Sequence, residues 1–90
     1  MLFRRNDWNI DHIAEHGVSP EEAEQVVERA RRPYPELREE SKWRAVGRGR
    51  GERWLQVIFV LDPEEEDTAF VIHARPLTEK EKKRERRRVQ

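Results

Sequence analysis

Residues 8–23 read Trp-Asn-Ile-Asp-His-Ile-Ala-Glu-His-Gly-Val-Ser-Pro-Glu-Glu-Ala, and they predict two helices separated by a sharp stop. Gly17 can adopt the left-handed conformation that ends many helices. The Ser-Pro-Glu-Glu motif at residues 19–22 then predicts a new helix, with serine as N-cap, proline at the first position and glutamate completing a capping box. We expect a first helix over Asn9–His16, capped by its asparagine, and a second over residues 19–31.

The chain downstream of these helices predicts a sheet followed by a third helix. Residues 43–48 and 53–61 have the pattern of hairpin arms around a glycine-rich turn, and residues 68–75 form a further alternating strand. The Pro-Tyr-Pro segment before them allows at most an edge strand through Leu37. A second capping box at residues 78–81 opens a highly charged last helix.

These elements predict an α+β fold with two N-terminal helices, an antiparallel sheet of three to four strands and a C-terminal helix. We expect a single domain over residues 1–90, with residues 84–90 as a frayed basic tail. Ala23, Val26, Val27 and Ala30 form an apolar stripe at helical spacing that can cover one sheet face. The opposite face then stays partly open.

The formal net charge is zero, but the charges are segregated along the chain. Residues 42–54 and 79–88 are basic, whereas residues 62–67 are acidic, and a basic patch attracts phosphate even on a neutral protein. The chain has no cysteine, which excludes a disulfide scaffold and thiolate metal sites. The longest apolar run, Val57–Leu61, is too short to cross a bilayer, so we expect a cytoplasmic protein without a membrane partner.

Alternation along the strands predicts a group of cationic, aromatic and polar side chains on the open sheet face. The residues expected there are Arg44, Arg48, Trp54, Gln56, His73 and Arg75.

This group suggests cleavage of RNA without a metal. A base removes the 2′-OH proton, a cation stabilises the charge that grows on the phosphate, and an acid protonates the leaving oxygen. His73 titrates in the useful range, while Arg75 and Arg48 could hold the phosphate and Trp54 could stack a base. In the alternative interpretation, His73 caps a strand edge and Arg75 pairs with Glu81.

Two further motifs have competing interpretations. His12-Ile13-Ala14-Glu15-His16 matches the H-x-x-E-H pattern of inverted zinc peptidases, but a structural role near a helix C-terminus is favoured. Residues 47–51, Gly-Arg-Gly-Arg-Gly, lack the Lys-Ser/Thr of a phosphate-binding loop and are better explained as a hairpin turn with basic flanks.

Several short motifs together resemble the BrnT-like toxins of bacterial type II toxin–antitoxin modules, over about residues 6 to 84. The motifs are Trp8-Asn9, His12-Ile13, His16-Gly17-Val18-Ser19, Glu21-Glu22-Ala23, Val46-Gly47-Arg48, Gly51-x-Arg53 and Ala74-Arg75-x-x-Thr78-x-x-Glu81. The resemblance implies a RelE-like fold, metal-independent endoribonuclease activity on messenger RNA, and neutralisation by a cognate antitoxin with a ribbon-helix-helix part. The matching positions are His12, His16, Arg48, Arg53, Arg75 and Glu81.

Two hypotheses follow, a ribonuclease toxin that needs no cofactor and no metal, or a non-catalytic module of the same fold that binds RNA or protein. For the toxin, the candidate catalytic residues are His73, Arg75, Arg48 and Glu81. The candidate RNA-binding residues are Arg44, Arg50, Arg53, Trp54 and Lys82.

Overall fold

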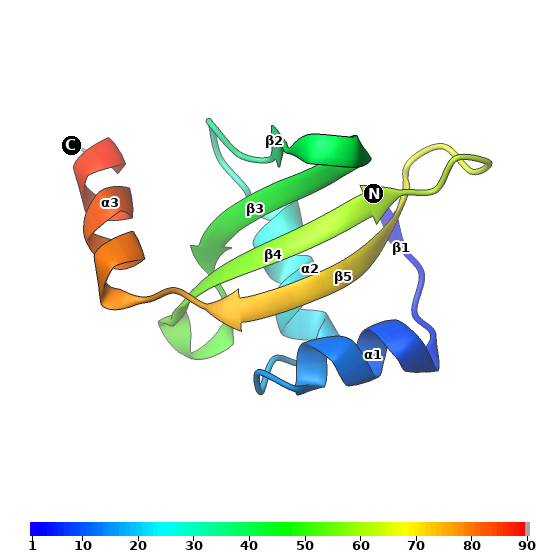
Figure 1. The fold of residues 1–90 in the computed structure, drawn as a ribbon, viewed down its shortest axis with the longest axis horizontal. Helices are drawn as coiled ribbons and strands as arrows, with labels where there is room; N and C mark the ends of the chain where they lie inside the picture. The colour runs from blue at the N-terminus through cyan, green and yellow to red at the C-terminus, as the bar shows by residue number, and fades with distance from the viewer. Residues whose placement is uncertain (90) are drawn as a thin grey trace.

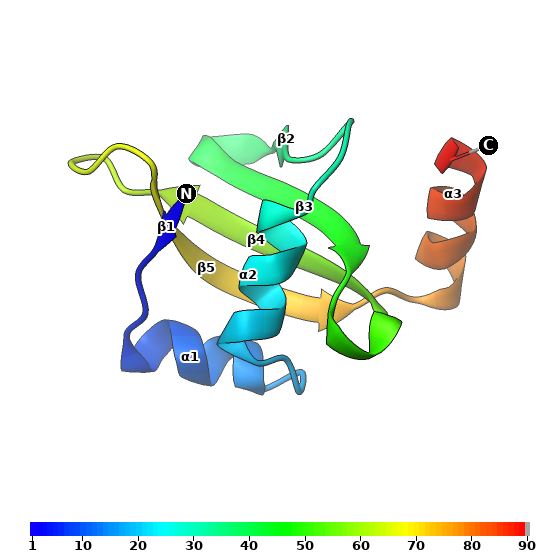
Figure 2. The ribbon, with the colours of Figure 1, turned by 180° about the vertical axis from the view of Figure 1, so that it is seen from behind.

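The computed structural model describes residues 1–89, which form a five-stranded sheet, two helices that pack on one side of it and a third helix at one end (Figures 1 and 2). The elements are β1 (Leu2–Phe3), α1 (Asp7–Ala14), α2 (Pro20–Glu28), β2 (Glu36–Leu37), β3 (Lys42–Arg48), β4 (Trp54–Leu61), β5 (Thr68–Pro76) and α3 (Glu79–Val89). Short 3-10 turns, η1 (Glu39–Ser41) and η2 (Arg50–Glu52), precede β3 and β4. The predicted α+β class is confirmed.

The sheet order is β1-β5-β4-β3-β2, and the sheet is mixed. The pairings among β2, β3, β4 and β5 are antiparallel as predicted, including the edge strand that reaches Leu37. The expectation of three to four antiparallel strands is nevertheless wrong, because β1 adds a fifth strand that runs parallel to β5. Two residues are too few to show an alternation, so the sequence gives no sign of this strand.

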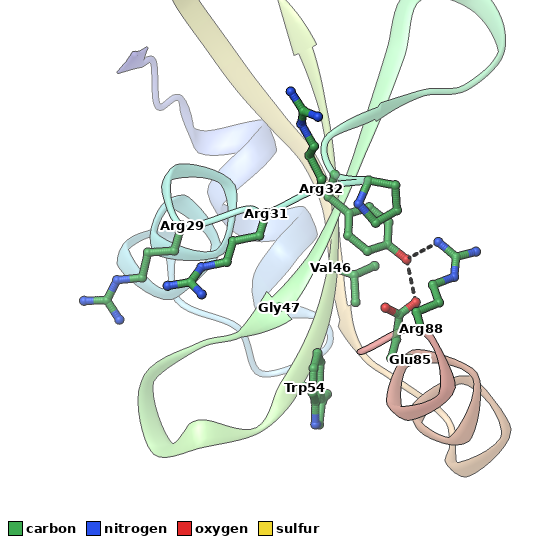
Figure 3. A pocket seen from close by; sticks show the side chains of 10 residues that line it. Arg29, Arg31, Arg32, Val46, Gly47, Trp54, Glu85 and Arg88 are labelled. Carbon is green, nitrogen blue, oxygen red and sulfur yellow. Dashed lines mark hydrogen bonds between the residues drawn. The ribbon is translucent and has the colours of Figure 1, made fainter. Parts of the chain in front are cut away.

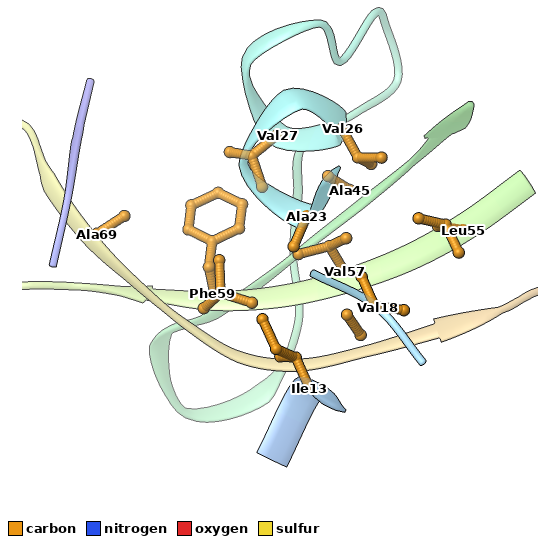
Figure 4. Close-up of a cluster of buried hydrophobic side chains, with 12 residues drawn as sticks. Ile13, Val18, Ala23, Val26, Val27, Ala45, Leu55, Val57, Phe59 and Ala69 are labelled. Carbon is orange, nitrogen blue, oxygen red and sulfur yellow. The ribbon is translucent and has the colours of Figure 1, made fainter. Parts of the chain in front are cut away.

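The core lies between α2, α1 and the sheet (Figure 4). Three residues of the predicted stripe, Ala23, Val26 and Val27, are less than a tenth exposed in α2, whereas Ala30 follows the helix and is partly buried. The three buried residues pack in one cluster with Leu55, Val57 and Phe59, which share the inner face of β4. Leu61, which continues the alternation of these residues, is 44% exposed at the far end of the strand.

The first helix begins earlier than predicted. Its N-cap is Asn6, whose side chain accepts a hydrogen bond from the Asn9 backbone N–H at 2.9 Å. The Asn9 side chain accepts in return from the Asn6 N–H at 2.7 Å, so Asn9 is the third residue of the helix rather than its cap. The helix ends at Ala14, and Gly17 has the left-handed φ of +70° that was predicted.

The second helix starts as predicted, with the Ser19 hydroxyl accepting from the Glu22 N–H at 3.2 Å. The capping box is incomplete, however, because the Glu22 carboxylate is bound by Arg53 and does not return to the cap. The helix also ends at Glu28, short of residue 31.

A β-bulge changes the faces of β5. Val71 pairs with Phe59 of β4, and His73 pairs with the neighbouring Ile58. Ile72 has no partner on β4 and is therefore the extra residue. Ala74 therefore faces the core together with Val71, whereas simple alternation places them on opposite faces. His73 and Arg75 still lie on the open face, as predicted, because they pair with open-face residues of β4.

The C-terminal helix is capped as predicted, with reciprocal hydrogen bonds between Thr78 and Glu81 at 2.8 and 3.2 Å. Residues 84–89 continue this helix, so the expected frayed tail is wrong for them, and residue 90 lies outside the described residues. Burial of Glu85 shows that this part of the helix makes tertiary contacts. None of the helices in the described part of the chain is both long and apolar enough to cross a membrane.

Candidate functional site

The open face of the sheet gathers several of the predicted side chains around Gln56. The Gln56 side-chain oxygen accepts from Arg44 Nε at 2.8 Å and from Arg75 Nη2 at 3.5 Å. Arg44 and His73 flank the same residue of β4, Ile58, in the strand register. A shallow hollow of about 290 Å³ lies at this point and is lined by Arg38, Glu39, Lys42, Arg44, Gln56, Ile58, Ile72 and His73.

His73 lies beside a second imidazole from another element. The ring centroids of His73 and His16 are 5.3 Å apart, with an edge-to-face angle of 64°. Burial lowers the pKa of His73, and the neighbouring His16 and Arg75 lower it further. His73 is therefore neutral at neutral pH and can accept a proton. The packing of α1 beside β5 creates this pair, and no local pattern in the sequence predicts it.

Arg75 is held by Glu81 at the start of α3. Two hydrogen bonds of 2.7 and 2.8 Å join the guanidinium to both carboxylate oxygens. This bidentate contact, with the Thr78 N–H, lowers the pKa of Glu81 to about 2. Glu81 is thus an anion at neutral pH that positions Arg75, and the predicted pairing of these two residues is confirmed.

Tyr34 links the sheet to α3. Its hydroxyl donates to Glu85 Oε1 at 2.5 Å and accepts from Arg44 Nη1 at 3.3 Å and Arg88 Nη1 at 3.2 Å. Figure 3 shows Glu85 and Arg88 side by side, with dashed lines for their bonds to this hydroxyl. Burial raises the pKa of Tyr34, and the hydrogen bond with Glu85 raises it further. No local pattern in the sequence predicts this network; the one available signal is a tyrosine held between two prolines, Pro33 and Pro35.

Arg48 and Trp54 lie opposite one another where β3 and β4 meet the turn. The Arg48 guanidinium carbon is 5.2 Å from the centroid of the Trp54 ring, within the range of a cation–π contact. Arg48 is exposed and its partner Glu52 is distant, at 3.8 Å. Arg48 and Trp54, both predicted for the open face, therefore lie side by side. They are at the end of the sheet opposite to β1.

Three other candidate residues lie away from this face. Arg53 binds Glu22 and the Gly17 carbonyl on the helix side of the sheet. Arg50 is exposed in η2, and Lys82 pairs with Glu79 on α3 at 3.1 Å. Of these three residues, Arg53 stabilises the fold through these contacts.

The two histidines of the H-x-x-E-H motif do not converge. His12 stacks on Trp8 with the ring centroids 4.3 Å apart, whereas His16 contacts His73. Over the part of the chain that the structure describes, no three His, Cys, Asp or Glu side chains are placed to hold a metal ion.

The chain was compared with protein-family models, with curated proteins and with solved structures, and none of them matches it.

Proposed function

We propose that this chain is a metal-independent endoribonuclease of the BrnT-like toxin type, acting on messenger RNA. The observation that carries the proposal is the contact of His73 with His16, with Arg75 two residues further along the same sheet face and a hollow beside His73. Two imidazoles can supply a base and an acid for a proton-transfer reaction, and a fixed guanidinium can stabilise the charge that develops between them.

In the proposed reaction, neutral His73 removes the proton from a ribose 2′-OH. The 2′ oxygen attacks the adjacent phosphorus, and Arg75 stabilises the negative charge on the phosphate oxygens. Protonated His16 gives its proton to the 5′ oxygen as the P–O bond breaks. The products are a 2′,3′-cyclic phosphate and a 5′-hydroxyl, and the two histidines end with exchanged protonation states.

The remaining open-face residues fit roles in RNA binding. Arg44 and Lys42 line the hollow next to His73, where phosphates flanking the cleaved bond would lie. Arg48 and Trp54 present a cation and an indole further along the same face. The resemblance to BrnT-like toxins supports the same assignment and adds a cognate antitoxin with a ribbon-helix-helix part as the partner.

The test is cleavage of a messenger RNA by the purified chain in the presence of EDTA. We expect cleavage with 2′,3′-cyclic phosphate ends, and losses of about 10²-fold or more in His73→Ala and Arg75→Ala. Lys83→Ala is the control, because Lys83 is an exposed residue of α3 outside the candidate site, and it should cleave within about threefold of the unmodified chain. Absence of cleavage, or equal cleavage by all variants, would contradict the proposal.

A non-catalytic module of the same fold is the second candidate. The engagement of Arg75 by both oxygens of Glu81 favours it, because this guanidinium must share its donors with any phosphate. The same preparations distinguish the two functions. Salt-sensitive RNA binding without cleavage at any pH would support the binding module.

The toxin assignment has its own test in cells. Expression of the chain alone should arrest growth and deplete messenger RNA, and co-expression of a ribbon-helix-helix protein encoded next to it should restore growth. The His73→Ala variant should be harmless at the same protein level. Unimpaired growth on expression of the intact chain would contradict a toxin.

A further inference from the structure

A second hollow of about 320 Å³ opens where the end of α2 approaches β3, β4 and α3 (Figure 3). Trp54 and Val46 line it from the sheet, and Tyr34 lines it from the segment after α2. Its volume falls in the range of small-ligand sites, roughly 300 to 1,000 Å³. Of its lining residues, only Trp54 is among the RNA-binding candidates predicted from the sequence.

Three arginines, Arg29, Arg31 and Arg32, contribute to the lining of this hollow. All three are exposed, and within the described residues none has a carboxylate within 4.0 Å. Arg44 and Arg75, by contrast, are already paired with carboxylates. The cluster therefore presents uncompensated positive charge beside an aromatic wall, which is the combination that single-stranded nucleic acid requires.

The acidic side chain of the hollow, Glu85, is buried, and its carboxylate accepts a hydrogen bond from the Tyr34 hydroxyl. Glu85 and Arg88 also line a third, smaller hollow, which reaches Arg44. Arg44 in turn borders the hollow at His73. A continuous path of lining residues thus connects the aromatic end of the face to the proposed site of cleavage.

We propose that this second hollow binds one nucleotide of a single-stranded RNA at a distance from the cleaved bond. Its base packs on Trp54, and its flanking phosphates bind Arg29, Arg31 and Arg32. The choice of RNA as ligand rests on the proposed function. An acidic peptide would also be attracted by the arginines, but its carboxylate side chains would not stack on Trp54.

The experiment measures binding of a short fluorescein-labelled 2′-O-methyl RNA, which cannot be cleaved through its 2′ oxygen. In the triple variant Arg29→Gln, Arg31→Gln, Arg32→Gln, we expect the affinity to fall by about tenfold or more at low salt. The slope of log affinity against log salt should decrease by about 1.4, since each of the two phosphates that flank the bound nucleotide contributes about 0.7 on a single strand. These side chains are exposed, so the variant should fold normally.

The matched control removes the same number of charges from the exposed side of α3, as Lys83→Gln, Arg86→Gln, Arg87→Gln. It should lose clearly less affinity than the first triple variant. Trp54→Leu keeps an apolar side chain in place and should weaken binding about fivefold or more through loss of stacking. Equal losses in the two triple variants, or no effect of Trp54→Leu, would overturn the proposal.

Two further measurements separate this proposal from the proposed function. Cleavage of a dinucleotide, which is too short to reach the hollow, should be the same in the first triple variant and the unmodified chain. If RNA binds through the hollow but no RNA is cleaved, the proposed function fails and the binding site stands. The second measurement uses a polyglutamate peptide as competitor. If the peptide displaces the RNA, and if its binding depends on the three arginines but not on Trp54, the ligand of this hollow is an acidic protein and not RNA.

Discussion

Glu22 and Arg53 are joined by two hydrogen bonds of 2.8 and 3.2 Å between the third residue of α2 and the start of β4. The Glu22 side chain is only 7% exposed, and Arg53 also donates to the Gly17 carbonyl at 2.7 Å. One ion pair thus connects α2, the turn before it and the end of the β3–β4 hairpin. It also explains why Glu22 does not complete the capping box of its own helix.

Replacement of Arg53 by alanine should destabilise the fold by about 2 kcal/mol, because a buried carboxylate then loses its donors. The measurement is urea unfolding of Arg53→Ala beside Arg50→Ala. Arg50 lies in the same turn, is exposed and should change the free energy of unfolding by less than about 0.5 kcal/mol. Similar free energies for the two variants would show that the Glu22 contact contributes little.

Gly49→Ala should also destabilise the protein, by about 1 to 3 kcal/mol, because a Cβ at this position would lie 2.5 Å from Glu22 Cγ. Arg53 fixes the Glu22 side chain, which therefore cannot move aside freely. In the Glu22→Ala background the overlap disappears, so the effect of Gly49→Ala should shrink to a few tenths of a kcal/mol. Additive effects in this double-mutant cycle, measured by urea unfolding, would rule out the clash.

The sequence predicts those parts of this fold that local patterns control. Gly17, the stripe of α2 and the hairpin around the glycine-rich turn are all found where helix stops, helical spacing and turn chemistry place them. The errors occur where tertiary contacts decide. Asn9 looks like a cap because asparagine favours caps, but Asn6 precedes it and the two exchange hydrogen bonds.

The same division applies to the candidate site. Alternation is sufficient to place His73 and Arg75 on the open face, since the bulge precedes both of them. The contact of His73 with His16 depends on how α1 packs beside β5, and the bonds of Tyr34 to Glu85 and Arg88 join segments more than fifty residues apart. Such contacts have no signature in a single sequence.

The Arg75–Glu81 pair should make stability depend on acid pH. The pKa of Glu81 is lowered from 4.5 to about 2, so the unfolded chain binds a proton more readily than the folded one between these values. The stabilisation is present above pH 4.5 and is lost as the pH falls towards 2. Because both side chains are partly exposed, we expect about 1 kcal/mol. Glu81→Gln should remove this part of the pH dependence in urea unfolding, and an unchanged acid profile would contradict the assignment.

The pKa of His73 should lie below its usual 6.5, because burial and the neighbouring His16 and Arg75 disfavour its charged form. Its contribution to stability is therefore present above pH 6.5 and is lost as the pH falls through the lowered value. An NMR titration of the imidazole signals measures this midpoint. His16→Gln should raise it and His12→Gln should raise it less, since His16 has the larger influence. A His73 midpoint at or above 6.5 in the unmodified chain would contradict its role as the base.

Tyr34 is the sole tyrosine of the chain, so an ultraviolet titration of tyrosinate reports on this residue alone. We expect a midpoint above 10, because burial and the hydrogen bond with Glu85 both favour the neutral phenol, while Arg44 opposes them. The raised pKa means that Tyr34 stabilises the fold below pH 10 and that this contribution is lost as the pH rises through the higher value. Glu85→Gln keeps a hydrogen-bond acceptor but removes the charge, and should move the midpoint down towards 10.

Because Glu85 lies on α3, the same variant should accelerate amide hydrogen exchange in that helix. Glu79→Gln, at an exposed position of α3, is the control and should alter neither the tyrosine midpoint nor the exchange. A midpoint that is the same in the Glu85→Gln variant would show that the tyrosine–glutamate bond does not hold α3 to the sheet.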